Sequence, residues 1–261
     1  ILQDLGKFEE AANSYKKAIL LRPEYPEAYN NLGNTFWALN LLDKAEDSFE
    51  KAILLKPEFI EAYNNLGNLL FKRGRLEDAE FKFLHALDFE PTIAETHNNL
   101  GVVLKAMGRF EAAETCFRQA IKLKSNYPEA CNNLANTLQE QGRFEDAEIL
   151  YLKAVELKPD YAEAYSNMGN ARKELGKLDE AVSSFQQAFA LRTGLLPEGD
   201  DPLAPATTDL YFELTNKCNF HCVFCPSDSQ KRIIGSMDLE LVKRLYDEAS
   251  TKKIASKVNL H

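Results

Sequence analysis

The sequence predicts a mostly α-helical protein of paired helices that continues into a short α/β segment. Three observations support this prediction: an internal period of 34 residues, a break rich in proline after residue 195, and a strand-like run that leads into three closely spaced cysteines. At 261 residues the chain has room for one large or two smaller domains. We divide it into a repeat array over residues 1–195, a linker over residues 196–208 and the start of a second domain over residues 209–261.

The repeat is defined by a small residue that recurs every 34 positions and by an aromatic residue 16 positions after it, with alanines on either side of the aromatic residue. The small residues are Gly33, Gly67, Gly101, Ala135 and Gly169, and the aromatic residues are Phe49, Phe83, Phe117, Tyr151 and Phe185. This pattern resembles the tetratricopeptide (TPR) repeat. The resemblance implies one partial and five complete units of two antiparallel helices, stacked into a right-handed superhelix whose first helices line a concave face.

In the first complete unit we expect helices near residues 26–39 and 43–56. Glycine inside a helix costs roughly 1 kcal/mol relative to alanine, so its recurrence at the Gly33 position indicates a packing requirement. A second glycine series occupies the turn between the two helices, where glycine easily adopts a positive φ, and Asn40 takes this turn position once. The turn glycines are Gly74, Gly108, Gly142 and Gly176.

Asparagine recurs with the same period on the first helix of each pair. One series lies two positions before the small residue, and another lies one position after it, with Val102 replacing asparagine in the third unit. A spacing of three residues places each pair on one helix face. The first series is Asn31, Asn65, Asn99, Asn133 and Asn167, and the second is Asn34, Asn68, Asn136 and Asn170.

Amide side chains offer hydrogen-bond donors and acceptors together, which suits the backbone of an extended peptide. The pattern is similar to the asparagine ladder in the TPR superhelix of O-linked N-acetylglucosamine transferase. We therefore predict that these asparagines bind a protein or an extended peptide in a groove of the repeat array. The alternative is that they satisfy neighbouring helices or lie in solvent.

Other polar residues of the repeats receive no chemical role. A glutamate recurs in the first turn of each first helix, where the helix dipole favours a carboxylate. Cys131 takes a position that is tyrosine or histidine in other units, so we expect Cys131 and Cys116 to pack in the core. His85 and His97 have no partner at metal-ligand spacing. The glutamates are Glu27, Glu61, Glu95, Glu129 and Glu163.

Residues 193–208 interrupt the period. Their prolines, glycine and aspartates cannot continue a helix and indicate a linker. Residues 210–214 then have the pattern of a strand, residues 236–251 that of an amphipathic helix with Asp238 as its candidate N-cap, and residues 257–260 that of a second strand. The order strand, cysteine loop, helix and strand is typical of the opening of a parallel α/β barrel.

Cys218, Cys222 and Cys225 lie within eight residues, between the first strand and the helix. An odd number of thiolates cannot be paired into disulfides, and iron–sulfur clusters are held by cysteine thiolates. A cube of four irons with three protein ligands leaves one iron open. The C-x3-C-x2-C spacing, with Phe224 before the third cysteine, resembles the radical S-adenosylmethionine enzymes.

That resemblance implies a 4Fe-4S cluster on the three cysteines, with S-adenosyl-L-methionine on the open iron and Phe224 beside its adenine. Reduction by a cellular electron donor would cleave this cofactor to a 5′-deoxyadenosyl radical that abstracts hydrogen from a substrate. Three alternatives remain open. Zinc would need His221 or a distant fourth ligand, a ferredoxin-type cluster would need a fourth cysteine, and the three cysteines could be free and structural.

Residues 209–261 cover only the opening of such a barrel, so we expect the sequence to be an inactive fragment, cut at both ends, of a radical S-adenosylmethionine enzyme. Its TPR array would recruit an unidentified substrate or partner, with a peptide as the candidate. The alternative is a non-enzymatic TPR scaffold for protein–protein interaction. The net charge of −9 argues against nucleic-acid binding, and no apolar run approaches the roughly 18 residues of a membrane span. A low-potential cluster needs reducing conditions, which favours a cytoplasmic location.

Overall fold

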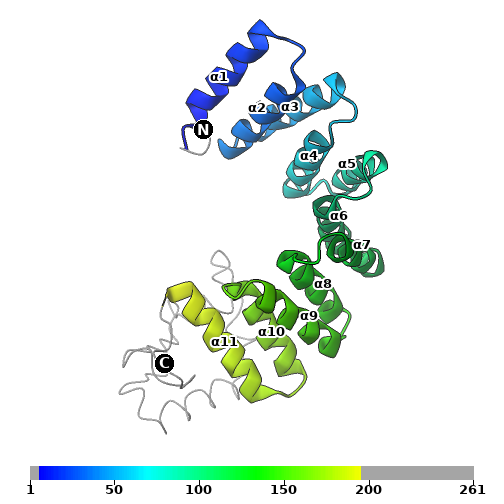
Figure 1. Ribbon diagram of the computed structural model, residues 1–261, viewed down its shortest axis with the longest axis vertical. Coiled ribbons are helices and arrows are strands. Elements are labelled where there is room, and N and C mark those ends of the chain that lie inside the picture. The colour runs from blue at the N-terminus through cyan, green and yellow to red at the C-terminus, as the bar shows by residue number, and fades with distance from the viewer. Residues whose placement is uncertain (1–5, 195–261) are drawn as a thin grey trace. The chain divides into compact units, whose positions relative to one another are not determined.

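The computed structural model describes residues 6–194, and every regular element in this range is an α-helix (Figure 1). The helices are α1 (Phe8–Leu21), α2 (Pro26–Ala38), α3 (Leu42–Leu55), α4 (Ile60–Lys72), α5 (Leu76–Phe89), α6 (Ala94–Ala106), α7 (Phe110–Leu123), α8 (Pro128–Glu140), α9 (Phe144–Leu157), α10 (Ala162–Glu174) and α11 (Leu178–Thr193). Helices α2 and α3 confirm the pair expected near residues 26–39 and 43–56. The strands and helix expected after residue 209 lie outside the described residues.

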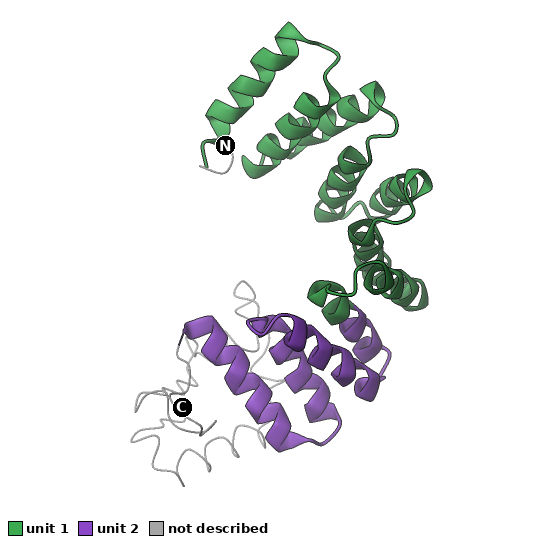
Figure 2. Ribbon diagram, viewed as in Figure 1, with its two compact units in different colours: residues 1–133 green, residues 134–261 purple. Residues whose placement is uncertain are grey.

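The described helices fall into two compact units (Figure 2). Unit 1 ends at Asn133 and holds α1 to α7 with the first part of α8, and unit 2 begins at Leu134 and holds the rest of α8 with α9 to α11. Within unit 1, each helix from α1 to α7 packs against the next one along the chain, and α4 also contacts both α2 and α6. Within unit 2, α10 packs against both α9 and α11.

The turn between the two helices of a pair has the backbone geometry that the sequence predicts. Gly74 has φ +75°, and Asn40, the one non-glycine residue in the series, has φ +57°. Two backbone hydrogen bonds end α4 at Gly74. The N–H of Gly74 donates to the carbonyl oxygen of Phe71 at 2.9 Å, and the N–H of Arg75 donates to the carbonyl oxygen of Leu70 at 3.0 Å. This is the Schellman pattern, which satisfies carbonyls that a helix end otherwise leaves open.

The glycine inside each first helix provides space for the aromatic ring of the second helix. A Cβ atom added at Gly67 would lie 2.8 Å from two ring carbons of Phe83, which is fully buried. A Cβ atom added at Gly33 would lie 2.6 Å from the nearest ring carbon of Phe49, and one added at Gly101 would lie 2.7 Å from the nearest ring carbon of Phe117. Alanines before and after the ring, such as Ala79 and Ala86, are also fully buried. The packing requirement inferred from the recurrent glycine is therefore a direct helix–ring contact.

Unit 2 contains two residue pairs at this position of the repeat, glycine with phenylalanine and alanine with tyrosine. Gly169 faces Phe185, whose ring begins 2.6 Å from the position of an added Cβ. In the preceding repeat the pair is Ala135 and Tyr151, and both residues are fully buried. A fully buried tyrosine must find a partner for its hydroxyl group.

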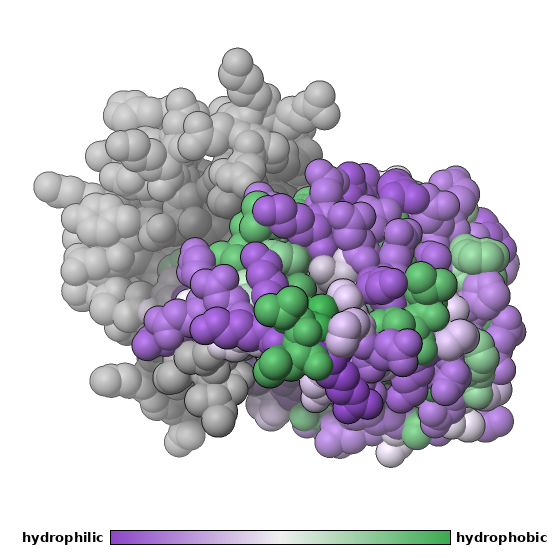
Figure 3. Space-filling view, turned by 90° about the horizontal axis from the view of Figure 1, so that it is seen from above, coloured by the Kyte–Doolittle hydropathy of each residue, from purple (hydrophilic) through white to green (hydrophobic). Residues whose placement is uncertain are grey.

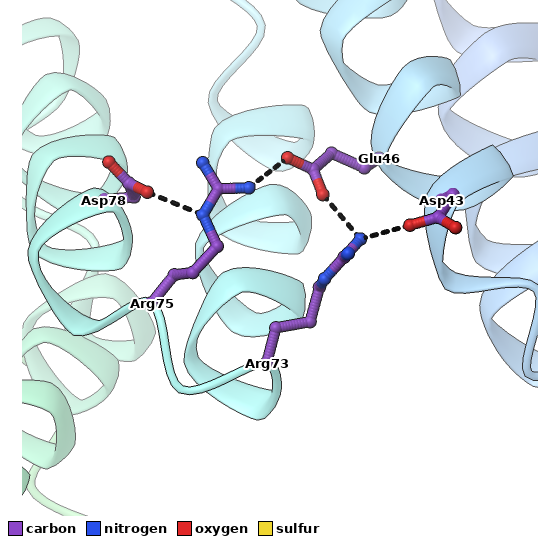
Figure 4. A network of polar contacts seen from close by, with 5 residues as sticks. All are labelled: Asp43, Glu46, Arg73, Arg75 and Asp78. Atoms are coloured by element: carbon purple, nitrogen blue, oxygen red, sulfur yellow. Dashed lines mark hydrogen bonds and ion pairs between the residues drawn. The ribbon is translucent and has the colours of Figure 1, made fainter.

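Ion pairs connect the second helices of successive repeats. In unit 1, Arg75 at the start of α5 bonds Glu46 on α3 and Asp78 on its own helix, while Arg73 bonds Glu46 and Asp43 (Figure 4). The same contact recurs between Arg109 and Glu80 in unit 1, and between Lys177 and Glu148 in unit 2. Exposed pairs are each worth about 0 to 1 kcal/mol, and this range applies to the pairs of unit 1 with partly exposed arginines. The Glu148 side chain of unit 2 is only 8% exposed.

Hydrophilic residues cover most of the described surface seen in Figure 3, and hydrophobic residues reach it in small groups. The largest exposed side chains include Phe81 on α5, which contacts the His85 ring edge-on at a centroid distance of 4.5 Å. In the part of the chain that the structure describes, no helix combines the length and the apolar composition that crossing a bilayer requires.

Candidate peptide-binding face

Hydrogen bonds between repeats engage the first series of asparagines in unit 1. Asn65 on α4 donates from Nδ2 to Oδ1 of Asn30 on α2, at 3.0 Å. Asn133 on α8 donates in the same way to Asn98 on α6, also at 3.0 Å. Asn30 and Asn98 are buried, with exposed fractions of 1% and 7%. These two contacts, called the amide rungs below, connect the first helices of successive repeats.

The acceptors of these rungs were not predicted from the sequence. They belong to a third asparagine series, directly before the first: Asn30, Asn64, Asn98 and Asn132. Its 34-residue period was a visible signal. The rung expected between Asn64 and Asn99 is not formed: the buried Oδ1 of Asn64 has no hydrogen-bond partner among the described residues, and Asn99 accepts from Nδ2 of Asn98 at 3.3 Å instead.

The second asparagine series behaves differently in unit 1. Asn34 on α2 and Asn68 on α4 are half-buried, and neither side-chain amide forms a hydrogen bond with a described residue. Val102 occupies the corresponding half-buried position on α6. Asn34, Asn68 and Val102, together with Asn31, Asn65 and Asn99 on the same three helices, are called the amide face below. Asn34 and Asn68 supply its uncommitted donors and acceptors.

In unit 2 the second series is already engaged at one position. The hydroxyl group of Tyr151 on α9 donates to Oδ1 of Asn136 at 2.5 Å and also lies 3.1 Å from Oε1 of Gln139. Burial, followed by the nearby carboxylates of Glu140 and Glu163, raises the pKa of Tyr151 far above its ordinary value, so this hydroxyl stays a donor. Asn167 is half-buried, whereas Asn170 is exposed and forms no hydrogen bond with a described residue.

One of the recurrent glutamates has a second role that the helix dipole does not explain. Glu61 accepts a hydrogen bond from Nδ2 of Asn30 at 2.9 Å, so Asn30 links both Glu61 and Asn65 of the next repeat. Glu27 lies 3.6 Å from Lys56, the residue directly after α3, in an exposed pair. Glu27 and Glu61, at this edge of the amide face, therefore have partners within the protein.

The core packing that the sequence predicts for the two repeat cysteines is confirmed for Cys131, whereas Cys116 is only partly buried. Cys131 is fully buried. Cys116 is half-buried, and burial, followed by the Glu80 carboxylate, raises the pKa of its thiol to about 11, so it stays protonated at neutral pH. The ring of His85 stacks on Tyr63 at a centroid distance of 5.8 Å, and Nε2 of His97 lies 2.8 Å from the carbonyl oxygen of Pro91.

Between residues 6 and 194 no group of three or more histidine, cysteine, aspartate or glutamate side chains could hold a metal ion. The predicted cluster ligands Cys218, Cys222 and Cys225, and the predicted cofactor contact Phe224, lie outside the described residues. The structure therefore leaves these predictions as they stand.

The helix pairs, their glycine–phenylalanine contacts and the Schellman turns together define a TPR protein. The sequence model of one TPR family, described as the cilia and flagella-associated protein 70 C-terminal domain, matches residues 2–204. The chain belongs to this family.

Solved TPR structures share the fold. MamA is 25% identical, and the match covers 62% of this chain and 95% of MamA with a TM-score of 0.57. YrrB is 24% identical over 69% of this chain and 93% of YrrB, with a TM-score of 0.56. PilW, a type IV pilus biogenesis factor, is 24% identical over 76% of this chain and 90% of PilW, with a TM-score of 0.67. A search of curated proteins finds no match.

Proposed function

We propose that the TPR array is a scaffold for protein–protein interaction that binds its partner as an extended peptide on the amide face. The observation that carries this proposal is the pair Asn34 and Asn68, whose half-buried amides form no hydrogen bond with a described residue. A half-buried amide without a protein partner must be satisfied by water or by a ligand. The two amides lie at equivalent positions of adjacent helices that contact each other, so one peptide backbone can reach both.

The fold also supports this function. YrrB, which shares the fold, is described as a TPR protein with an unusual peptide-binding site, so a peptide site is compatible with this architecture. The amide rungs hold α2 against α4, and the ion pairs around Glu46 hold α3 against α5. A face built on such braced helices loses little conformational entropy when a ligand binds.

The decisive variant is the double substitution Asn34→Ala with Asn68→Ala, assayed against a display library of random peptides. We expect it to lose most of the peptides that the wild type captures, with an unchanged helical circular dichroism spectrum. Asn13→Ala, at an exposed asparagine of α1, is the matched control and keeps capture intact. Equal capture by the double variant and the wild type would remove the amide face from the proposal.

We also propose, from the sequence, that the protein is a radical S-adenosylmethionine enzyme. The supporting observation is the run Cys218, Cys222 and Cys225 with Phe224. The three thiolates would hold a 4Fe-4S cluster, S-adenosyl-L-methionine would bind beside it, and a cellular electron donor would reduce the cluster in a cytoplasmic location. Bound there, the cluster would supply reductive cleavage of S-adenosyl-L-methionine. The TPR array would then recruit the substrate or a partner of that enzyme.

Anaerobic iron–sulfur reconstitution of the protein tests this second proposal. We expect the brown absorbance and the electron paramagnetic resonance signal of a 4Fe-4S cluster, both lost when the three cysteines are replaced by alanine. Replacement of Cys116 and Cys131 is the control, because both pack in the repeats. Tetrahedral zinc in the reconstituted protein, or the absence of any cluster, would leave the scaffold as the only function.

A further inference from the structure

Lys72, the last residue of α4, is an exposed cation at the edge of the amide face. Its ammonium nitrogen lies 5.9 Å from the ring centroid of Trp37 on α2, within the range of a cation–π contact. Among the described residues it forms no ion pair with a carboxylate. The next residue, Arg73, bonds both Asp43 and Glu46. Lys72 is therefore a cation that the protein positions on a ring without neutralising it.

Two contacts frame the surface between α2 and α4. At one end the amide rung joins Asn65 to Asn30, and at the other Lys72 lies over Trp37. Asn34 and Asn68 lie between these contacts, because Asn68 is three residues after Asn65 and four before Lys72. The uncommitted amides and the uncommitted cation therefore share one stripe of the helix surface.

The negative charges of this face lie at the opposite end of the helices. Glu61 is eleven residues before Lys72, which is roughly 16 Å along an α-helix at 1.5 Å per residue. It accepts a hydrogen bond from Asn30, and Glu27 pairs with Lys56. Glu61 and Glu27 are thus engaged within the protein, while the Lys72 ammonium group at the other end of α4 has no carboxylate partner among the described residues.

The geometry points to an acidic extended peptide as the ligand of the amide face. Its backbone lies on Asn34 and Asn68, and one of its aspartate or glutamate side chains pairs with the Lys72 ammonium beside the Trp37 ring. This inference rests on the proposed function and adds the chemistry of the ligand to it. The chain's net charge of −9 repels acidic peptides in general, so a preference for them requires a local cation.

The fluorescence of Trp37, the one tryptophan of the sequence, reports binding at this position directly. The probes are three matched peptides in which serine alternates with glutamate, glutamine or lysine. We expect the wild type to bind the glutamate peptide roughly 1.4-fold to fivefold tighter than the glutamine peptide, the range for one exposed ion pair. High salt should reduce this preference because it screens exposed charges.

Lys72→Gln should bind the glutamate and glutamine peptides equally, and Lys72→Glu should favour the lysine peptide. Lys51→Glu, at an exposed lysine of α3, is the matched control and keeps the wild-type order. Binding that needs Asn34 and Asn68 but shows equal affinity for all three peptides would overturn the acidic preference and leave the proposed function standing. A glutamate preference that survives Lys72→Gln would also overturn it. If the wild type bound none of the three peptides, and so did not differ from the double variant Asn34→Ala with Asn68→Ala, both the acidic preference and the proposed function would be overturned.

Discussion

Units 1 and 2 use the same repeat but satisfy its polar groups differently. In unit 2 the Tyr151 hydroxyl donates to Asn136, so a core residue binds the amide of the neighbouring helix. In unit 1 the residue equivalent to Tyr151 is Phe83, which has no hydroxyl, and Asn68 has no partner among the described residues. At these two equivalent positions, the asparagine with a partner in the protein is the one that faces a core hydroxyl group.

The charged groups follow the same division. In unit 2, Glu148 has a side chain only 8% exposed and accepts from Arg172 at 2.7 Å and from Lys177 at 2.6 Å. In unit 1, Arg73 and Arg75 share Glu46 but each keeps a second acidic partner, and Lys72 has none. Unit 2 therefore satisfies Asn136 and Glu148 within the protein, whereas Asn34, Asn68 and Lys72 of unit 1 have no such partner among the described residues.

The largest effect that tests this comparison is expected from removal of the buried carboxylate. Glu148→Ala should lower the free energy of unfolding by about 2 kcal/mol, because it leaves Arg172 largely buried without its main partner. The matched substitution Glu46→Ala in unit 1 should cost less than about 1 kcal/mol, since Asp43 and Asp78 still pair with the two arginines. Urea unfolding followed by circular dichroism measures both. If the two substitutions lowered the free energy of unfolding equally, the ion-pair networks around Glu148 and Glu46 would contribute equally to stability.

Much of the fold could be predicted from the sequence, because the period repeats each requirement five times. The glycine at position 67 and the phenylalanine at position 83 predict a tight helix–ring contact, and the structure places the ring 2.8 Å from an added Cβ. Asn40 was predicted to replace the turn glycine and has φ +57°. These features depend only on local conformation and on contacts within one repeat. Both are the same in every repeat, so they can be predicted from residues that recur with the period.

The candidate site was less predictable, because it depends on how one repeat is rotated against the next. Asn64 and Asn65 are adjacent and identical, and the sequence alone does not show which of such a pair points into the interface between repeats. In the first rung the acceptor is Asn30, from the series that the sequence analysis passed over. The hydroxyl of Tyr151 is a single departure from the period, and its consequence for Asn136 follows only from coordinates.

The next prediction transplants that hydroxyl into unit 1. Phe83→Tyr should place an oxygen near Asn68, keep stability within about 1 kcal/mol and weaken peptide binding, because the new hydroxyl competes for the amide. Phe117→Tyr is the matched control: its repeat has Val102 in place of asparagine, so the buried hydroxyl lacks that acceptor and should cost about 1 to 2 kcal/mol. Unfolding in urea and titration of Trp37 fluorescence measure the two effects. Identical costs for both variants would mean that the asparagine does not accept the hydroxyl.

A smaller effect on the free energy of unfolding is expected at the contact between Gly67 and the Phe83 ring. Its sign should depend on whether the ring is present. Gly67→Ala should destabilise the wild type by about 1 kcal/mol, because the clash with Phe83 outweighs the better helix propensity of alanine. In the background of Phe83→Leu, where the ring is gone, the same substitution should stabilise by up to about 1 kcal/mol. The double-mutant cycle measures this coupling. If Gly67→Ala had the same sign in both backgrounds, direct contact would not explain the recurrent glycine.

The smallest predicted effect concerns acid. Burial alone would raise the pKa of Glu148, but hydrogen bonds from Lys177 and Arg172 outweigh it and hold this pKa below its ordinary value of 4.5. A carboxyl group whose pKa is lowered by folding stabilises the protein above that ordinary value, and this contribution is lost as the pH falls through the lowered pKa. The wild type should therefore lose stability below about pH 4.5 more steeply than Glu148→Gln.

The loss should be smaller than the cost of Glu148→Ala, because a protonated carboxyl group keeps its shape and can still accept a hydrogen bond. Urea unfolding of both proteins between neutral and acidic pH measures the difference, and Glu156→Gln on the exposed side of α9 is the control. A gap between wild type and Glu148→Gln that stays constant across this range would mean that the carboxylate is not stabilised by its two cations. The buried network of unit 2 would then differ from the exposed network of unit 1 in burial alone, and the contrast between the units would rest on Tyr151 and Asn136.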